Sequence, residues 1–172
     1  MDFASSQTPQ RPREQSASPL PHHDRFPDHR IGLDEARRLW DSDLPPRVTS
    51  GTGAKTHSRW ITPDGATRSM VSGRDADANH AAKLLADRGM KRTPMAVDHV
   101  ETKVAARMAR DGIREATIVI NNKTCESRGP WGYGCKDLLP LILPAGYRLT
   151  VWDYDEHGNP RRITYTGGAT PP

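Results

Sequence analysis

One histidine and two cysteines of this chain have the side chains and the order of a zinc site. His99 stands where a helix is expected to begin, and Cys125 and Cys135 flank the start of a later helix. One imidazole and two thiolates supply three ligands of a tetrahedral zinc ion, and a water molecule can take the fourth position. Three protein ligands with one open position are typical of catalytic zinc sites, whereas structural sites use four protein ligands. The pattern therefore predicts a zinc enzyme.

Glu101 is a candidate catalytic residue because it lies two positions after His99 and is not needed as a ligand. Zinc lowers the pKa of a bound water to near 7. A neighbouring carboxylate can take that proton and return it to the ring nitrogen and the leaving amine of a substrate. The motif H-x-E followed by P-C-x-x-C is the signature of zinc-dependent nucleobase deaminases. The spacing of histidine and glutamate thus indicates hydrolytic deamination.

The cysteine part of the motif departs from that signature in two ways. Thr124 precedes the first cysteine in place of proline, and nine residues instead of two separate the two cysteines. The intervening segment, ESRGPWGYG, is rich in glycine and can loop out, so the two cysteines can still share one ion. Its aromatic residues, Trp131 and Tyr133, either offer a stacking surface to a base withdrawn from its stack or pin the loop to the body.

The segments that must position these residues alternate between strand and helix patterns. A Pro-Asp-Gly turn between two alternating runs predicts a hairpin, and apolar residues at helical spacing predict helices. The expected elements, in chain order, are strands 55–62 and 66–72, helices 75–87 and 98–111, strand 116–120, a helix from residue 135, and strands 147–154 and 161–166. This order predicts an α/β fold in which helices pack on a sheet.

Residues 1–46 differ in composition from the rest of the chain. They contain 7 of the 15 prolines and have a net charge of −2, whereas residues 47–172 have a net charge of +6. Residues 1–30 lack an apolar period and predict a disordered linker. Residues 31–40 predict a short helix, which either docks on the body or belongs to a larger parent chain. We therefore expect a Pro-rich linker with a short helix over 1–46 and one globular domain over 47–172.

The composition of the 172-residue chain excludes several classes of protein. No segment approaches the ~20 consecutive apolar residues of a membrane span. The N-terminus lacks the basic region and apolar run of a secretory signal. Two cysteines are too few for a disulfide-dense scaffold. The basic body suits a polyanionic partner such as nucleic acid.

The run DHVETKVAARMARDGIREATIVINNKTC, followed by CKDLLPLILPAGYRLTV, resembles the DddA-like DNA cytosine deaminase toxin domains of bacteria. The segments TPDG, SGRD and TYTGG are similar as well, and the resemblance covers roughly residues 52–168. It implies a cytidine-deaminase-like fold, a mixed sheet of about five strands packed between helices. It also implies hydrolytic conversion of cytosine to uracil in DNA.

The resemblance also implies roles for single residues. His99, Cys125 and Cys135 would hold Zn²⁺, and Glu101 would be the proton shuttle. Asn121 and Asn122 match the pair of asparagines that follows the central strand in such domains. Their amides are expected to line the pocket, where they can hydrogen-bond a base edge or a phosphate.

The biological setting follows from the resemblance alone. Such domains usually act as antibacterial toxins that a dedicated immunity protein neutralises. We accordingly expect a monomer that is secreted, or delivered by a specialised system, into the cytoplasm of a target bacterium. Single-stranded DNA is slightly favoured over duplex DNA as substrate, because no residue stands out as a wedge that opens a duplex.

Three other interpretations remain open at this point. The chain can be a non-catalytic zinc-binding module that binds nucleic acid. Cys125 and Cys135 can instead form a disulfide in a binding domain without metal. The third alternative is a deaminase that acts on RNA or on free nucleosides.

Overall fold

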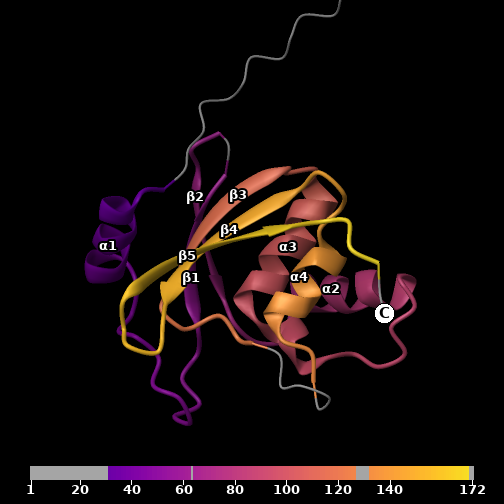
Figure 1. Ribbon diagram of the computed structural model, residues 1–172, viewed down its shortest axis with the longest axis horizontal. Coiled ribbons are helices and arrows are strands. Elements are labelled where there is room, and N and C mark those ends of the chain that lie inside the picture. The colour runs from indigo at the N-terminus through magenta and orange to yellow at the C-terminus, as the bar shows by residue number, and fades with distance from the viewer. Residues whose placement is uncertain (1–30, 63, 127–131, 171–172) are drawn as a thin grey trace, which may run out of the picture.

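The computed structural model, shown in Figure 1, describes residues 31–62, 64–126 and 132–170. Its elements are α1 (Leu33–Ser42), β1 (His57–Ile61), β2 (Thr67–Val71), α2 (Ala76–Asp87), the 3₁₀ turn η1 (Met95–Asp98), α3 (Val100–Asp111), β3 (Glu115–Ile120), α4 (Cys135–Ile142), β4 (Arg148–Tyr154) and β5 (Pro160–Thr166). The predicted α/β fold with a mixed five-stranded sheet is confirmed. The prediction of disorder for residues 1–30 lies outside the described residues.

The sheet has the strand order β2-β1-β3-β4-β5, and β3 and β4 are its only parallel neighbours among the described strands. Five consecutive residues of β3 are buried, as the β-branched run of this strand predicts. A parallel connection needs a crossover of a dozen or more residues, usually a helix. The segment between β3 and β4 supplies it with α4, so the loop before α4 starts at the carboxyl end of β3.

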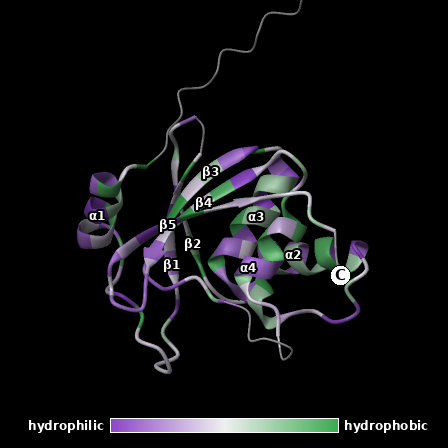
Figure 2. Ribbon diagram, viewed as in Figure 1, coloured by the Kyte–Doolittle hydropathy of each residue, from purple (hydrophilic) through white to green (hydrophobic). Residues whose placement is uncertain are grey.

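Helices α2, α3 and α4 cover one face of the sheet and α1 covers the other (Figure 1). The main hydrophobic core lies among α2, α3, α4 and the strands, and it includes Val104, Ile118 and Leu138. Figure 2 shows hydrophobic residues on these helices as well as on the strands. A smaller core on the opposite face joins α1 to Val119 and Trp152. The sheet is therefore packed between helices.

Helix α1 docks on the body, which the sequence left open. The Trp40 indole donates from Nε1 to the carbonyl of Ile120 at 2.8 Å, and the Trp152 indole donates to the carbonyl of Ile31 at 2.8 Å. The rings of Trp40 and Trp152 meet edge to face with 6.5 Å between their centroids. Because Ile120 ends β3, the first of these bonds ties α1 to the root of the loop that contains Cys125.

The start of α3 is held by the turn that follows β2. Gly73 has a φ of +123°, and its N–H donates to the carbonyl of Asp98 at 2.7 Å. The Lys103 ammonium is almost fully buried and donates to the carbonyls of Val71 and Gly73 and to the Asp75 carboxylate. These bonds fix the first turn of α3, where His99 and Glu101 lie, against the end of β2.

None of the helices in the described part of the chain has the length and hydropathy that crossing a membrane requires.

Candidate metal centre

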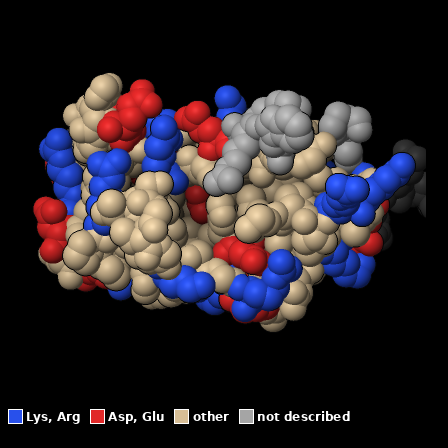
Figure 3. Space-filling model, turned by 90° about the horizontal axis from the view of Figure 1, so that it is seen from below, with Lys and Arg blue, Asp and Glu red and all other residues tan. Residues whose placement is uncertain are grey.

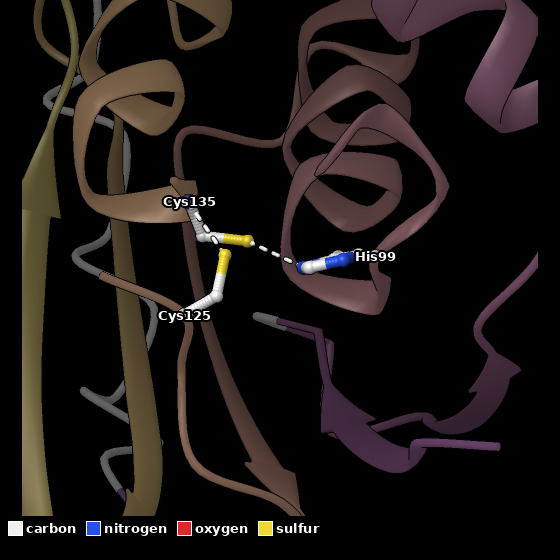
Figure 4. Close-up of side chains that lie close together, drawn as sticks. All are labelled: His99, Cys125 and Cys135. Carbon is white, nitrogen blue, oxygen red and sulfur yellow. Dashed lines mark hydrogen bonds between the residues drawn. The ribbon is translucent and has the colours of Figure 1, made fainter. Parts of the chain in front are cut away.

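Three side chains from distant parts of the chain converge at one point (Figure 4). His99 is the N-cap of α3, Cys125 lies in the loop after β3, and Cys135 is the first residue of α4. Their ligand atoms all lie within 4.8 Å of one another. The Cys135 sulfur is 3.3 Å from Nδ1 of His99. The fold therefore brings together the three residues that the sequence singled out as zinc ligands.

The separations of these atoms suit a single tetrahedral ion. Zn–N bonds of ≈ 2.0 Å and Zn–S bonds of ≈ 2.3 Å at tetrahedral angles place the ligand atoms about 3.5 to 3.8 Å apart. Cys135 also donates its backbone N–H to the Cys125 sulfur at 3.0 Å, which stabilises a thiolate there. Both cysteines are free thiols in this structure, not a disulfide.

The pKa values of the two thiols are shifted in opposite directions. Hydrogen bonds from Cys135 and from the His99 ring lower the pKa of Cys125 to about 4. The neighbouring Cys125 sulfur and burial raise the pKa of Cys135 well above its ordinary value. Two thiolates this close repel each other, so ionising both requires a cation between them. The donor set thus fits a soft divalent metal such as zinc.

Glu101 lies in the first turn of α3 and is 3% exposed. Burial raises its pKa to about 7, although the nearby His99 opposes that shift. Its carboxyl also interacts with the Cys135 side chain, so it lies beside the three candidate ligands. A carboxyl group with a pKa near neutrality can both accept and return a proton, which is the requirement for a general acid and base.

A known family accounts for this arrangement. The family described as SCP1.201-like deaminase matches residues 40–169 of the chain. The chain belongs to this family. No curated protein matches the chain. The protein is therefore a hydrolytic deaminase, and its His99, Cys125 and Cys135 cluster can bind a metal ion.

The two asparagines after β3 occupy different surroundings in the deaminase. Asn121 is 2% exposed. Its amide donates to the carbonyls of Pro45 and Pro46 and accepts the backbone N–H of His57 at 2.7 Å. These bonds join three backbone segments, so the contacts of Asn121 are structural, and a contact with substrate stays a prediction.

Asn122, by contrast, faces a cavity of about 510 Å³ that also reaches Cys125. Its amide donates to the Thr56 hydroxyl at 2.7 Å, and its oxygen accepts the backbone N–H of Lys123 at 2.8 Å. The cavity opens beside one candidate metal ligand and is lined by Arg47, Val48, Ser50 and residues 122–126. The predicted contact of Asn122 with a base or a phosphate stays a prediction.

The structure describes one of the two aromatic residues between Cys125 and Cys135. Tyr133 is 45% exposed and lies two residues before Cys135. An exposed phenol ring can stack on a base, and this role of Tyr133 stays a prediction. Trp131 lies outside the described residues, and its role stays a prediction.

Two residues that contact the neighbours of Cys125 were not identified from the sequence. Asp153 of β4 is fully buried and pairs with Arg161, its direct neighbour on β5. The sequence does indicate that these two residues pair, because a turn over residues 155–159 places their opposite charges across from each other on adjacent strands. What the strand pattern does not reveal is that Asp153 also accepts the backbone N–H of Thr124, next to Cys125.

The raised pKa of Glu101 predicts how the stability of the metal-free deaminase depends on pH. Its pKa rises from 4.5 to about 7 on folding, so the folded state binds this proton more tightly than the unfolded state. The resulting stabilisation is complete below about pH 4.5 and is lost as the pH rises through 7. Glu101→Gln has no carboxyl group to ionise, so it does not lose this stabilisation. Its free energy of unfolding relative to that of the parent should therefore rise by up to about 3 kcal/mol over this pH range.

Urea denaturation of both zinc-free proteins at several pH values measures this difference. Stability curves that run parallel from about pH 4.5 to pH 8 would contradict the burial of an ionisable Glu101.

Proposed function

We propose that this deaminase converts cytosine in DNA to uracil. Water adds at the ring carbon that holds the amino group, and that group leaves as ammonia. The observation that supports this reaction is the convergence of His99, Cys125 and Cys135 beside the buried carboxyl of Glu101 in a member of a deaminase family. The proposal assigns His99, Cys125 and Cys135 to the binding of Zn²⁺ and Glu101 to proton transfer.

Glu101 performs the proton transfers in this scheme. When bound, zinc supplies a water molecule acidified to near neutral pH as the nucleophile. Glu101 would accept one proton of the attacking water and deliver it to the ring nitrogen. It would then take the second proton from the added hydroxyl and deliver it to the amine, which leaves as ammonia. Because its carboxyl is 3% exposed, bulk water has little access to the transferred proton. His99, Cys125 and Cys135, the candidate ligands, come from three separate segments: the N-cap of α3, the loop after β3 and the start of α4.

Several charges favour a polynucleotide over a free nucleoside. The cavity beside Cys125 includes the cations Arg47 and Lys123 in its lining, together with the carboxylate of Glu126. Among the residues that the structure describes, the Lys123 ammonium has only long ion pairs, at 3.8 Å to Glu126 and 3.6 Å to Glu156, so it can turn to a phosphate. Figure 3 shows Lys and Arg side chains spread over this face of the molecule, interspersed with Asp and Glu side chains. Phosphate contacts of this kind supply sequence-independent affinity for nucleic acid.

The preference for DNA, the toxin role and the immunity protein have the sequence resemblance as their support. We propose a monomeric antibacterial toxin that acts on DNA in a target bacterium, with single-stranded DNA slightly favoured. Tyr133, exposed beside Cys135, is a candidate to stack on the base next to or at the site of reaction.

An assay with four matched substrates tests this function. Purified protein with one equivalent of zinc is incubated with a cytosine-containing single strand, its duplex, the same sequence in RNA, and free cytidine. We expect uracil in DNA, detected by strand cleavage after uracil excision, and ammonia release above the Glu101→Gln background. Turnover of RNA or cytidine alone would contradict the substrate. Bound zinc without turnover of any of the four would indicate a non-catalytic module.

A further inference from the structure

We propose that Asp153 and Arg161 are positioning residues that hold Cys125 in place as a metal ligand. This inference rests on the proposed metal centre, but it concerns a support that neither the family nor the motif assigns. The pair spans the antiparallel neighbours β4 and β5, which are remote in sequence from the cysteine loop.

The pair contacts the residues on both sides of Cys125. On the preceding side, the Asp153 carboxylate accepts the backbone N–H of Thr124 at 2.8 Å. On the following side, the Arg161 guanidinium lies 3.7 Å from the carboxylate of Glu126. The two charged side chains of this cross-strand pair therefore contact the residues immediately before and after Cys125.

The pair itself is rigid. Arg161 donates from Nε to one oxygen of Asp153 at 2.9 Å and from its terminal nitrogen to the other at 2.7 Å. Such a two-pronged contact fixes direction as well as distance. Asp153 is fully buried, and its hydrogen bonds with Arg161, together with its charge, raise the pKa of the Arg161 guanidinium. A buried charge that is paired and fully hydrogen-bonded makes a stiff support.

The cysteine loop needs such a support because its spacing lacks the tight turn of C-x-x-C. With two intervening residues, one turn sets the distance between the sulfurs. With nine, the loop has many more conformations, and holding its ends together costs more entropy. The Thr124 hydroxyl has no hydrogen-bond partner among the described residues. The backbone bond to Asp153 is thus the polar contact that fixes Thr124.

Asp153→Asn tests the role because an amide cannot satisfy all the donors that the carboxylate now accepts. If the amide oxygen faces Thr124, the amide N–H groups face Arg161, and the pair is lost. If the amide oxygen faces Arg161, the hydrogen bond from the backbone N–H of Thr124 is lost. Support groups of this kind typically change metal affinity by 10–100-fold. We expect the zinc affinity of Asp153→Asn, measured by competition with a chromophoric chelator at fixed pH, to fall by about that factor.

The matched control is Asp77→Asn. Asp77 is also a buried aspartate that pairs with arginines, Arg107 and Arg110, but it joins α2 to α3 and makes no ion pair with the described part of the cysteine loop. The control should lose thermal stability and keep the parent zinc affinity. Equal losses of zinc affinity in the two variants, or none in Asp153→Asn, would overturn the proposal.

A second variant and a second measurement cover the case in which Asp153→Asn does not fold. Arg161→Lys keeps the charge and can occupy only one of the two donor positions, so zinc affinity should fall more than in Asp77→Asn. Hydrogen exchange of the Thr124 amide in zinc-free protein should be faster in Arg161→Lys than in the parent. Unchanged exchange would refute the support, whereas a parent protein that binds no zinc would refute the metal assignment instead.

Discussion

Glu101→Gln should abolish deamination while leaving the zinc in place. Glutamine has nearly the same shape as glutamate, but it cannot take a proton from water or deliver one to the substrate. General acid–base groups contribute about 10² to 10⁴ in rate. Because the proposal gives Glu101 every proton transfer of the reaction, we expect a loss of at least about 10³-fold in kcat. Uracil formation in DNA measures the rate, and chelator competition measures the zinc.

The result distinguishes a proton shuttle from a ligand. A ligand would lose the metal on substitution, and the zinc content of Glu101→Gln would fall with the activity. The control is Asp77→Asn, which removes the charge of another buried carboxylate on a neighbouring helix. It should retain turnover at temperatures where it is folded. Full activity of Glu101→Gln would contradict the assigned mechanism.

Cys135→Ser should lose bound zinc and all activity together. Cys135 is fully buried, its sulfur lies 3.3 Å from the His99 ring, and its backbone N–H contacts the Cys125 sulfur. Serine is not deprotonated at neutral pH and is a poor ligand for zinc. After dialysis, the parent should contain one zinc ion per chain and the variant close to none, as measured by atomic absorption.

The thermal stability of the two proteins gives an independent readout. A ligand that binds only the folded state adds about 4 kcal/mol at a thousand-fold excess over its Kd. Zinc should therefore raise the Tm of the parent and leave that of Cys135→Ser unchanged. Thiol titration adds a control, because both parent thiols should react only after chelation. A parent that contains no zinc and loses both thiols without reductant would support a disulfide.

Local patterns in the sequence predicted the elements with small errors in their ends. The helix expected over 98–111 begins at Val100, because His99 is an extended N-cap residue, and it ends as expected before Gly112. Gly112 adopts the left-handed conformation that ends helices. The family resemblance implied a mixed sheet, but only the structure shows that β3 and β4 are the parallel pair, since periodicity does not report which strands pair.

Contacts between distant segments were decided by the tertiary structure. The Asn121 amide donates to the carbonyls of Pro45 and Pro46, which lie 76 and 75 residues away in the sequence. The docking of α1 depends on Trp40 reaching the carbonyl of Ile120, 80 residues away. No local period contains such information, because these bonds depend on how the layers of the fold are stacked.

The amino-acid sequence alone determined the chemistry available to this protein: an imidazole, two thiols and a carboxyl, in the order and on the elements that a zinc deaminase requires. Residue types and spacing are sufficient for that, because ligand preference is a property of the side chain and helix and strand starts follow local rules. Only the tertiary structure decided that these groups meet, that Glu101 is buried beside them, and that Asp153 and Arg161 contact the neighbours of Cys125. Burial and cross-strand register arise from packing the whole chain, and they determine the pKa values and the geometry on which the chemistry depends.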